Sequence, residues 1–251
     1  MSRVGRHGTI AGRKAAQDSK RAAMFTKYAK AITVAAKDGG DPEYNAGLRV
    51  AIEKAKAISM PNDNITRAIK KGTGELGGAS YEELSFEGYG AGGVAVIVDC
   101  LTDNNNRTVA NIRSYFTKFG GALGTQGSVE FMFDHKSVFK VKGDKPVDLE
   151  ELELELIDLN VDDVYMDEEE KQDGTIVKQI VIYGAFESYG AIQKYLEENG
   201  FELISGGFER IPNVPLKSLS GEQKEAVEKL LNKIEEDDDV QNVYHTMSMA
   251  E

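Results

Sequence analysis

The sequence is poor in the residues that build disulfide frameworks and thiolate metal sites. It has one cysteine, three histidines and no tryptophan, so an intrachain disulfide and a cysteine-based metal site are both excluded. The single thiol, Cys100, lies in the apolar run VAVIVDCL, where we expect a buried structural side chain. A reducing cytoplasm is the expected compartment.

Long apolar runs are also lacking. No stretch approaches the roughly 18–20 consecutive apolar residues that cross a bilayer. The N-terminal segment MSRVGRHGTIAGRK has no apolar core of a secretory signal. Hydrophobic residues still make up 41% of the chain and charged residues 29%, which is enough apolar material for packed cores and too much for a disordered chain. We expect a globular protein that retains a basic N-terminal arm.

Positive charge is scarce overall and concentrated at one end. The net charge is −12, which by itself argues against a nucleic-acid partner. Residues 1–80, however, carry 15 Lys and Arg against 7 Asp and Glu, a net of +8, and residues 81–251 carry 15 against 35, a net of −20. The acidic remainder would repel a polyanion, so this asymmetry restricts nucleic-acid contact to the N-terminal end.

The N-terminal part, from about residue 15 to 72, predicts three helices. The first has an apolar stripe and a basic stripe almost opposite to it, so we expect it to be apolar toward its partners and basic toward the outside. On this interpretation, alanine at Lys20, Lys27 and Lys30 leaves the fold unaffected. The apolar positions are Phe25, Ala29, Ile32 and Ala36, and the basic positions are Lys20, Lys27, Lys30 and Lys37.

After the glycine-rich segment GTGELGGAS the hydrophobic period changes to that of strands. Strands at 81–89 and 94–101, a helix at 109–119 and a strand at 128–133 give the order β-β-α-β. The stretch 135–212 then reads β-α-β-β-α-β, which is the complete order of a ferredoxin-like unit. A final helix and short strand, within 213–251, can supply the helix and strand that the earlier unit lacks.

The sequence therefore predicts an α+β multidomain protein. An N-terminal three-helix domain is followed by two ferredoxin-like two-layer α/β domains, one inserted in the other. The expected domains are 1–78 (basic arm and helices), 79–134 plus 213–251 (α/β) and 135–212 (the inserted α/β domain).

Two glycine- or asparagine-rich segments could suggest phosphate binding. GYGAGG joins two strands and lacks the Lys-Ser/Thr pair of a P-loop, so a hairpin turn is the preferred interpretation. The segment from Thr102 to Thr108 follows a buried strand and opens a helix. Its free backbone N–H groups and Arg107 could hold a phosphate, but a helix-capping loop is the expected alternative.

The acidic run from Glu235 to Asp239 suggests Mg²⁺ binding, and hence a distant alternative, a Mg²⁺-dependent enzyme. Adjacent acids without metal-ligand spacing are usually solvated, and at a helix C-terminus they mark where the helix ends. His7, His135 and His245 have no catalytic partner at a diagnostic spacing. We therefore predict no catalytic residue, no metal site and no cofactor.

The basic end supplies the candidate nucleic-acid contacts, because lysine and arginine neutralise phosphates without reading sequence. No recognition helix with identifiable base-reading residues is evident. A purely protein-binding adaptor, in which the basic face meets an acidic partner, is a further alternative. The candidate nucleic-acid-binding residues are Arg3, Arg6, Arg13, Lys14, Lys20, Arg21, Lys27, Lys30, Lys70, Lys71 and Arg107.

Several long runs, almost from end to end, are similar to the YebC family. They are FTKYAKAITVAAKDGGDPEYN, LRVAIEKAKAISMPNDNITRAIKKGTGEL, FEGYGAGGVAVIVDCLTDNNNRT, FTKFGGALGTQGSVEFMFD and DDDVQNVYHTM. The resemblance implies one helical and two α/β domains, no catalytic activity and no required cofactor. It also implies a probable DNA-binding transcriptional regulator, or, for some branches and for mitochondrial relatives, a ribosome-associated translation factor.

The N-terminal arm departs from the family's pattern. Many members open with GHSKWANIKHRK, whereas this chain has RVGRHGTIAGRK, and Ala91 replaces the proline of the usual GYGPGG. These changes suggest a divergent paralogous branch. The expected function is a non-enzymatic, cytoplasmic DNA-binding regulator of transcription. The alternative is a translation factor that binds rRNA or tRNA in the ribosome, and in either case the acidic α/β domains could engage a protein partner.

Overall fold

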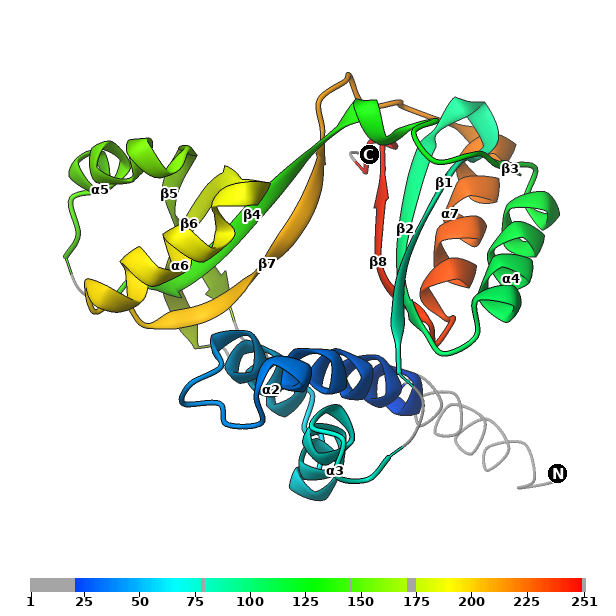
Figure 1. Ribbon diagram of the computed structural model, residues 1–251. Helices are drawn as coiled ribbons and strands as arrows, with labels where there is room; N and C mark the ends of the chain where they lie inside the picture. The colour runs from blue at the N-terminus through cyan, green and yellow to red at the C-terminus, as the bar shows by residue number, and fades with distance from the viewer. Residues whose placement is uncertain (1–20, 78–79, 145, 171–174, 250–251) are drawn as a thin grey trace, which may run out of the picture. The chain divides into compact units, whose positions relative to one another are not determined.

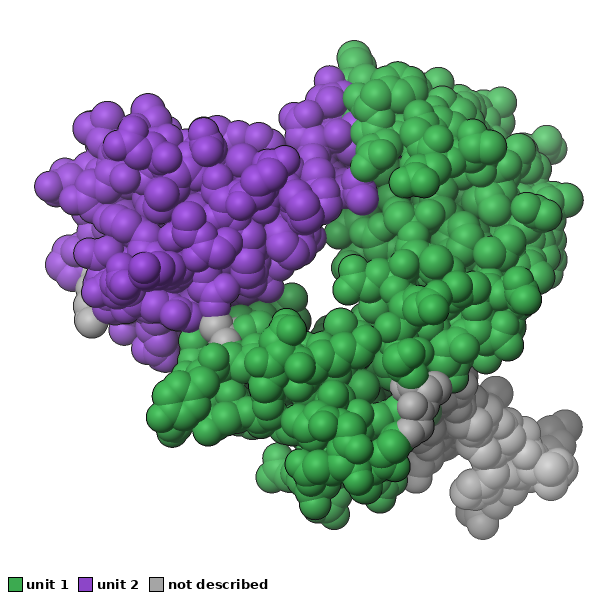
Figure 2. All heavy atoms as spheres, in the orientation of Figure 1, with its two compact units in different colours: residues 1–132, 214–251 green, residues 133–213 purple. Residues whose placement is uncertain are grey.

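The computed structural model describes residues 21–77, 80–144, 146–170 and 175–249. They form two compact units, Met1–Met132 with Val214–Glu251 and Phe133–Asn213, shown in Figure 2. The expected α+β multidomain class is confirmed: helices precede two separate four-stranded sheets, and one sheet is inserted between parts of the other. Only the inserted sheet has the ferredoxin-like strand order expected for both, because β1 and β2 of the first sheet form a hairpin. The division of the chain into three domains at the expected boundaries stays a prediction.

The N-terminal helices pack around a small apolar core. A helix over 21–35 continues into the 3₁₀ turn η1 (Ala36–Asp38), and α2 (Ala46–Ala57) and α3 (Asn62–Gly72) follow (Figure 1). The Asn45 side chain caps α2 by accepting a hydrogen bond from the Leu48 N–H at 2.9 Å. The buried core residues of these helices are Ile32, Ala36, Leu48, Ile52, Ala55, Met60, Ile65 and Ala68.

Gly72 lets two of these helices approach each other closely. A Cβ atom at this position would lie 2.3 Å from the Thr33 carbonyl oxygen and 2.6 Å from the Ala36 Cβ. No side chain larger than hydrogen fits there without moving α3 away from the helix over 21–35. The glycine at the end of α3 therefore sets the spacing of this pair.

The first sheet has the strand order β3-β1-β2-β8. Its strands are β1 (Glu82–Tyr89), β2 (Ala95–Thr102), β3 (Ala122–Leu123) and β8 (Val240–His245). The helices α4 (Asn105–Lys118) and α7 (Gly221–Glu235) pack together against it (Figure 1). Ile112 and Phe116 of α4 and Leu230 of α7 are fully buried against β2. Cys100 is buried, as expected from the sequence, and burial raises the pKa of its thiol.

The GYGAGG segment is a hairpin turn, as expected, because β1 and β2 are antiparallel neighbours around it. It contains the short 3₁₀ turn η2 (Ala91–Gly93), in which Gly92 and Gly93 adopt φ of 66° and 71°. The helix-capping interpretation of the loop before α4 is also confirmed, since the Asn104 side chain accepts the Arg107 N–H at 3.1 Å.

The strand expected at 128–133 is wrong. That segment contains the 3₁₀ turn η3 (Glu130–Met132), and the short β3 pairs with β1 instead. The buried carboxylate of Glu87 explains the difference. It accepts hydrogen bonds from the backbone N–H groups of Gly127, Val129 and Glu130 at 2.6, 2.8 and 2.8 Å. These donors are then not available to a neighbouring strand.

The inserted unit is an antiparallel four-stranded sheet in the order β5-β6-β4-β7, which is the ferredoxin-like order expected from the sequence. Two helices cover one face, with Leu156 and Ile192 fully buried in the core. The elements are β4 (Phe133–Lys142), α5 (Leu149–Leu156), η4 (Ile157–Leu159), β5 (Val161–Glu170), β6 (Ile176–Ala185), η5 (Phe186–Ser188), α6 (Tyr189–Glu198) and β7 (Leu203–Pro212).

Candidate nucleic-acid interface

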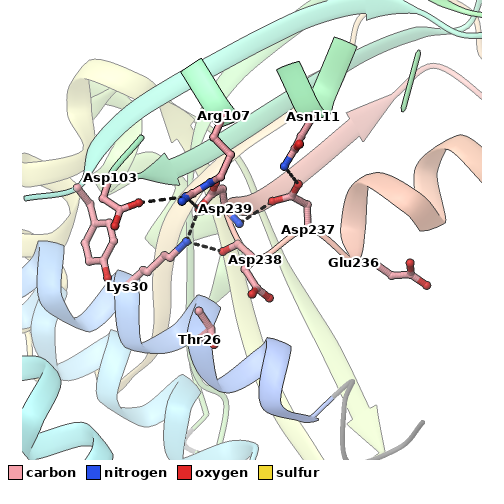
Figure 3. A pocket seen from close by; sticks show the side chains of 10 residues that line it. Thr26, Lys30, Asp103, Arg107, Asn111, Glu236, Asp237, Asp238 and Asp239 are labelled. Carbon is pink, nitrogen blue, oxygen red and sulfur yellow. Dashed lines mark hydrogen bonds and ion pairs between the residues drawn. The ribbon is translucent and has the colours of Figure 1, made fainter. Parts of the chain in front are cut away.

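The basic side of the helix over 21–35 faces the acidic turn between α7 and β8. Lys30 is only 7% exposed. Its Nζ lies 2.5 Å from Asp239 Oδ1 and donates to the backbone carbonyl oxygens of Asp238 at 2.8 Å and Leu101 at 3.3 Å. Figure 3 shows the side chain reaching from the helix toward this turn. Lys30 therefore joins the helical region to the α/β fold.

Asp239 is the shared partner of several donors. It is 3% exposed, and Arg107 reaches the same carboxylate from α4, with its NH2 nitrogen 2.9 Å from Oδ2 (Figure 3). The Thr108 hydroxyl lies 2.8 Å from Oδ2. Burial pushes the pKa of Asp239 upward, but the hydrogen bonds from Lys30, Arg107 and Thr108 outweigh it and lower the pKa below its ordinary value. The carboxylate is thus a buried, ionised anchor.

A polar pocket of about 480 Å³ surrounds this anchor. Asp237 is also held, since Tyr115 donates its hydroxyl at 2.8 Å and Asn111 its amide at 3.2 Å to Oδ2. Within the described ranges, no three His, Cys, Asp or Glu side chains are placed to share a metal ion. The pocket is lined by Thr26, Lys30, Tyr81, Asp103, Arg107, Asn111, Glu236, Asp237, Asp238 and Asp239. Its carboxylates outnumber its cations, so it does not favour a phosphate.

These contacts correct three expectations. The expected exposed basic face is wrong at Lys30, because that face packs against acidic residues from a distant part of the chain. Arg107 is half exposed but bound to Asp103 and Asp239, so it is not free to hold a phosphate. Its pKa is raised, first by the hydrogen bond to Asp239 and then by that to Asp103. The acidic run does end α7, as expected, but Asp239 is buried and not solvated.

Lys27 belongs to the same contact. Its Nζ donates to the Glu235 carbonyl oxygen at the end of α7, where the helix dipole favours a positive charge. Burial lowers the pKa of Lys27, and the nearby Glu235 and Asp237 partly oppose that shift. Like Lys30, this residue is engaged within the molecule and is not presented to a ligand.

Exposed cations of the helical region include Arg67 and Lys70 on α3 and Arg21 on the neighbouring helix. The Lys70 side chain is exposed, and neither it nor the exposed side chain of Arg67 has a hydrogen bond or ion pair with any described residue. Lys71 is half-buried, donates to the Tyr81 hydroxyl at 2.9 Å and lies 4.7 Å from the centroid of that ring. Arg21, on the neighbouring helix, is exposed and lies 5.4 Å from the Phe25 ring centroid. Together these residues form a cationic surface.

The remaining expected contacts lie outside the described residues. They are Arg3, Arg6, Arg13, Lys14 and Lys20. The sequence analysis did not predict three residues at or beside the cationic surface, namely Asn64, Arg67 and Tyr81. The spacing of Asn64, Arg67 and Lys71, i, i+3 and i+7, could have indicated a polar helix face. Tyr81 carried no such signal, because it follows the linker and meets α3 only in the fold.

Comparisons with known proteins cover nearly the whole chain. Residues 6–75 match the model of the TACO1/YebC protein N-terminal domain, and residues 81–247 match that of the TACO1/YebC second and third domain. The chain belongs to the TACO1/YebC family. The resemblance to the YebC family read from the sequence is therefore confirmed.

Relatives within the TACO1/YebC family are similar over nearly their full length. A "probable transcriptional regulatory protein" of Parabacteroides distasonis is 52% identical, covering 90% of this chain and 89% of its own length. A protein of the same description from Flavobacterium johnsoniae is also 52% identical, with 94% and 95% coverage. The crystal structure of a conserved hypothetical protein from Aquifex aeolicus is 38% identical, with a TM-score of 0.69 and 93% coverage of both chains.

No helix in the described parts of the chain is long and apolar enough to span a bilayer.

Proposed function

We propose that this protein is a non-enzymatic regulator of gene expression that binds DNA through its helical region. The observation that carries the proposal is the outward-facing cationic surface formed by Arg21, Arg67, Lys70 and Lys71 in a chain whose residues 81–251 have a net charge of −20. The relatives described as probable transcriptional regulatory proteins support the same function.

The physical basis is phosphate neutralisation. Each lysine or arginine that contacts a phosphate releases condensed counterions, which supplies most sequence-independent affinity. Arg67 and Lys70 suit this role because no described carboxylate neutralises them. The acidic α/β parts repel a polyanion and so orient the helical region toward it. The basic arm residues Arg3, Arg6, Arg13, Lys14 and Lys20 stay candidate phosphate contacts because of their charge alone.

A structural role for the polar pocket supports the non-enzymatic part of the proposal. Lys30 and Arg107 are bound to Asp239, and Asp237 accepts hydrogen bonds from Asn111 and Tyr115. These groups hold the helical region and the α/β fold together, so the contacts around Asp239 and Asp237 are used structurally. A cytoplasmic location is part of the proposal and is supported by the relatives described as probable transcriptional regulatory proteins.

The test is the binding of a fluorescent DNA duplex, measured by anisotropy at several salt concentrations. We expect the double variant Arg67→Ala with Lys70→Ala to bind more weakly at every sequence and to lower the salt slope by up to about 0.9 per lost contact. The matched control removes Lys178 and Lys194, two lysines of the inserted unit with 61% and 74% exposed side chains. Equal losses in both double variants would refute a specific cationic surface.

A ribosome-associated translation factor is the second candidate. It is favoured by the nature of the cationic surface, which offers phosphate contacts that carry no sequence information. Sedimentation of cell lysate through a sucrose gradient distinguishes the two. Co-migration with ribosomes at low salt that survives DNase supports the translation factor, whereas retention on chromosomal DNA supports the transcriptional regulator.

A further inference from the structure

A groove of about 280 Å³ runs between the helix over 21–35 and α3, next to the cationic surface. Its lining comes from both helices and from the residue that precedes β1. The lining residues are Phe25, Thr26, Ala29, Thr33, Asn64, Arg67, Ala68, Lys71 and Tyr81. It is distinct from the polar pocket at Asp239, with which it shares only Thr26 and Tyr81.

The floor of the groove is largely apolar. Phe25, Ala29 and Ala68 contribute carbon atoms, and the Thr33 hydroxyl is turned toward the carbonyl oxygens of Ala29 and Ala68, at 2.9 and 3.1 Å. The floor is therefore suited to the flat face of a ring and not to a phosphate, whose solvation it could not replace.

The rim of the groove has the opposite character. The Arg67 guanidinium is exposed and has no hydrogen bond or ion pair within the part of the chain that the structure describes. Lys71 fixes the Tyr81 ring through both its hydroxyl and its face. Lys30 also lies 5.6 Å from the centroid of that ring. The rim thus combines the Tyr81 ring, which Lys71 holds in place, with the unneutralised positive charge of Arg67.

We propose that this groove takes one unpaired base of a single-stranded nucleic acid, while Arg67 at its rim contacts both the base and its phosphate and Lys70 contacts a flanking phosphate. The inference rests on the proposed nucleic-acid-binding function and deepens it by naming the form of the target. An apolar floor beside an aromatic ring and cations is the combination that holds single strands, because bases stack on rings and the backbone follows the charge. A base inside a duplex is already stacked and paired and cannot enter.

The test compares three short oligonucleotides by fluorescence anisotropy at low salt. They are a single strand of mixed sequence, the same strand with abasic residues at its centre, and its duplex. Abasic residues keep the phosphates and remove the bases. We expect the intact strand to bind about tenfold more tightly than the abasic strand, since stacking contributes roughly 1–3 kcal/mol per base, and more tightly than the duplex.

Two variants of α3 locate the effect. Arg67→Gln and Lys70→Gln each remove one exposed charge, but only Arg67 lines the groove. Lys70→Gln should weaken the intact and abasic strands by the same factor, whereas Arg67→Gln should reduce the difference between them. Ala29→Leu, which fills the floor, should abolish that difference, with circular dichroism confirming its helical content.

The outcomes separate this inference from the proposed function. Equal affinity of the wild-type protein for intact and abasic strands overturns the base-binding groove but leaves phosphate binding by the cationic surface in place. Tighter binding of the duplex than of the intact strand overturns it as well. If no probe binds, the proposed function fails together with it.

Discussion

Lys30 and Asp239 are 209 positions apart in the chain and meet as a buried ion pair with a nitrogen–oxygen distance of 2.5 Å. The pair links the first described helix to the turn that precedes the last strand. Lys27 and Lys30, two lysines of the basic stripe on that helix, therefore bind within the molecule and are not available to a ligand. The consequences can be measured.

The first prediction concerns Lys30 itself. Lys30→Ala should lower the stability of the protein, because it leaves Asp239 buried with fewer cationic partners. Removing one member of a buried pair costs roughly 3–5 kcal/mol, and we expect the lower end of that range since Arg107 and Thr108 remain. Urea denaturation measures the change. The exposed Lys194→Ala is the control, and unfolding of Lys30→Ala at the wild-type midpoint would contradict the anchor.

The second prediction concerns the pH dependence of stability. The pKa of Asp239 is lower in the folded protein than its ordinary value, which is about 3.9 in the unfolded chain. The carboxylate therefore contributes its full stabilisation above that value and loses it as the pH falls through the lowered pKa.

Asp239→Asn tests this pH dependence. It should be less stable than the wild type at pH 7, and the gap should narrow as the pH is lowered below about 4. Thermal unfolding of both proteins across this range measures the gap. A gap that stays constant down to the lowest pH would show that the lost stability is not electrostatic.

The third prediction concerns the loop before the inserted unit. Glu87→Gln should loosen this loop. The two carboxylate oxygens of Glu87 accept hydrogen bonds from three backbone N–H groups, whereas an amide has only one acceptor oxygen. Hydrogen bonds to a charged group contribute about 1.5–3 kcal/mol each, so a drop in Tm of several degrees is expected. Amide hydrogen exchange should accelerate at Gly127, Val129 and Glu130.

The exposed Glu83, on the same strand as Glu87, gives the matched control. Glu83→Gln changes the same functional group without removing a buried acceptor, so its Tm and its exchange rates should match those of the wild type. If the two variants behave alike, the carboxylate of Glu87 does not hold the loop.

The fourth prediction contrasts two glycines of the helical region. Gly72→Ala should destabilise the protein, since the new Cβ would lie 2.3 Å from the Thr33 carbonyl oxygen. Gly47→Ala, in α2, places its Cβ in ordinary contact at 3.5 Å from the Asn45 side chain and should stabilise by up to about 1 kcal/mol. Thermal unfolding compares the two, and shifts of the same sign would refute the close helix approach at Gly72.

Much of the fold follows from local pattern. The buried strand β2 is an apolar run interrupted by Asp99, and the β-α-β-β-α-β order of the inserted unit is visible in the alternation of strand and helix periods. The hairpin at Gly92 needs a residue that adopts a positive φ readily, and the cap at Asn104 needs a short side chain with an acceptor oxygen. These features are set by neighbours in the chain, so the sequence alone determined them.

The errors arose where a distant residue decided the structure. The segment 128–133 alternates like a strand, but the Glu87 carboxylate, about 40 positions earlier, takes up its backbone donors. A helical projection places Lys30 opposite the apolar face, but it contains no information on the acids near residue 239. Local periodicity determined which elements form. Only the tertiary structure decided which charges are neutralised inside the molecule and which remain for a ligand, because electrostatic partners are chosen by distance in space and not along the chain.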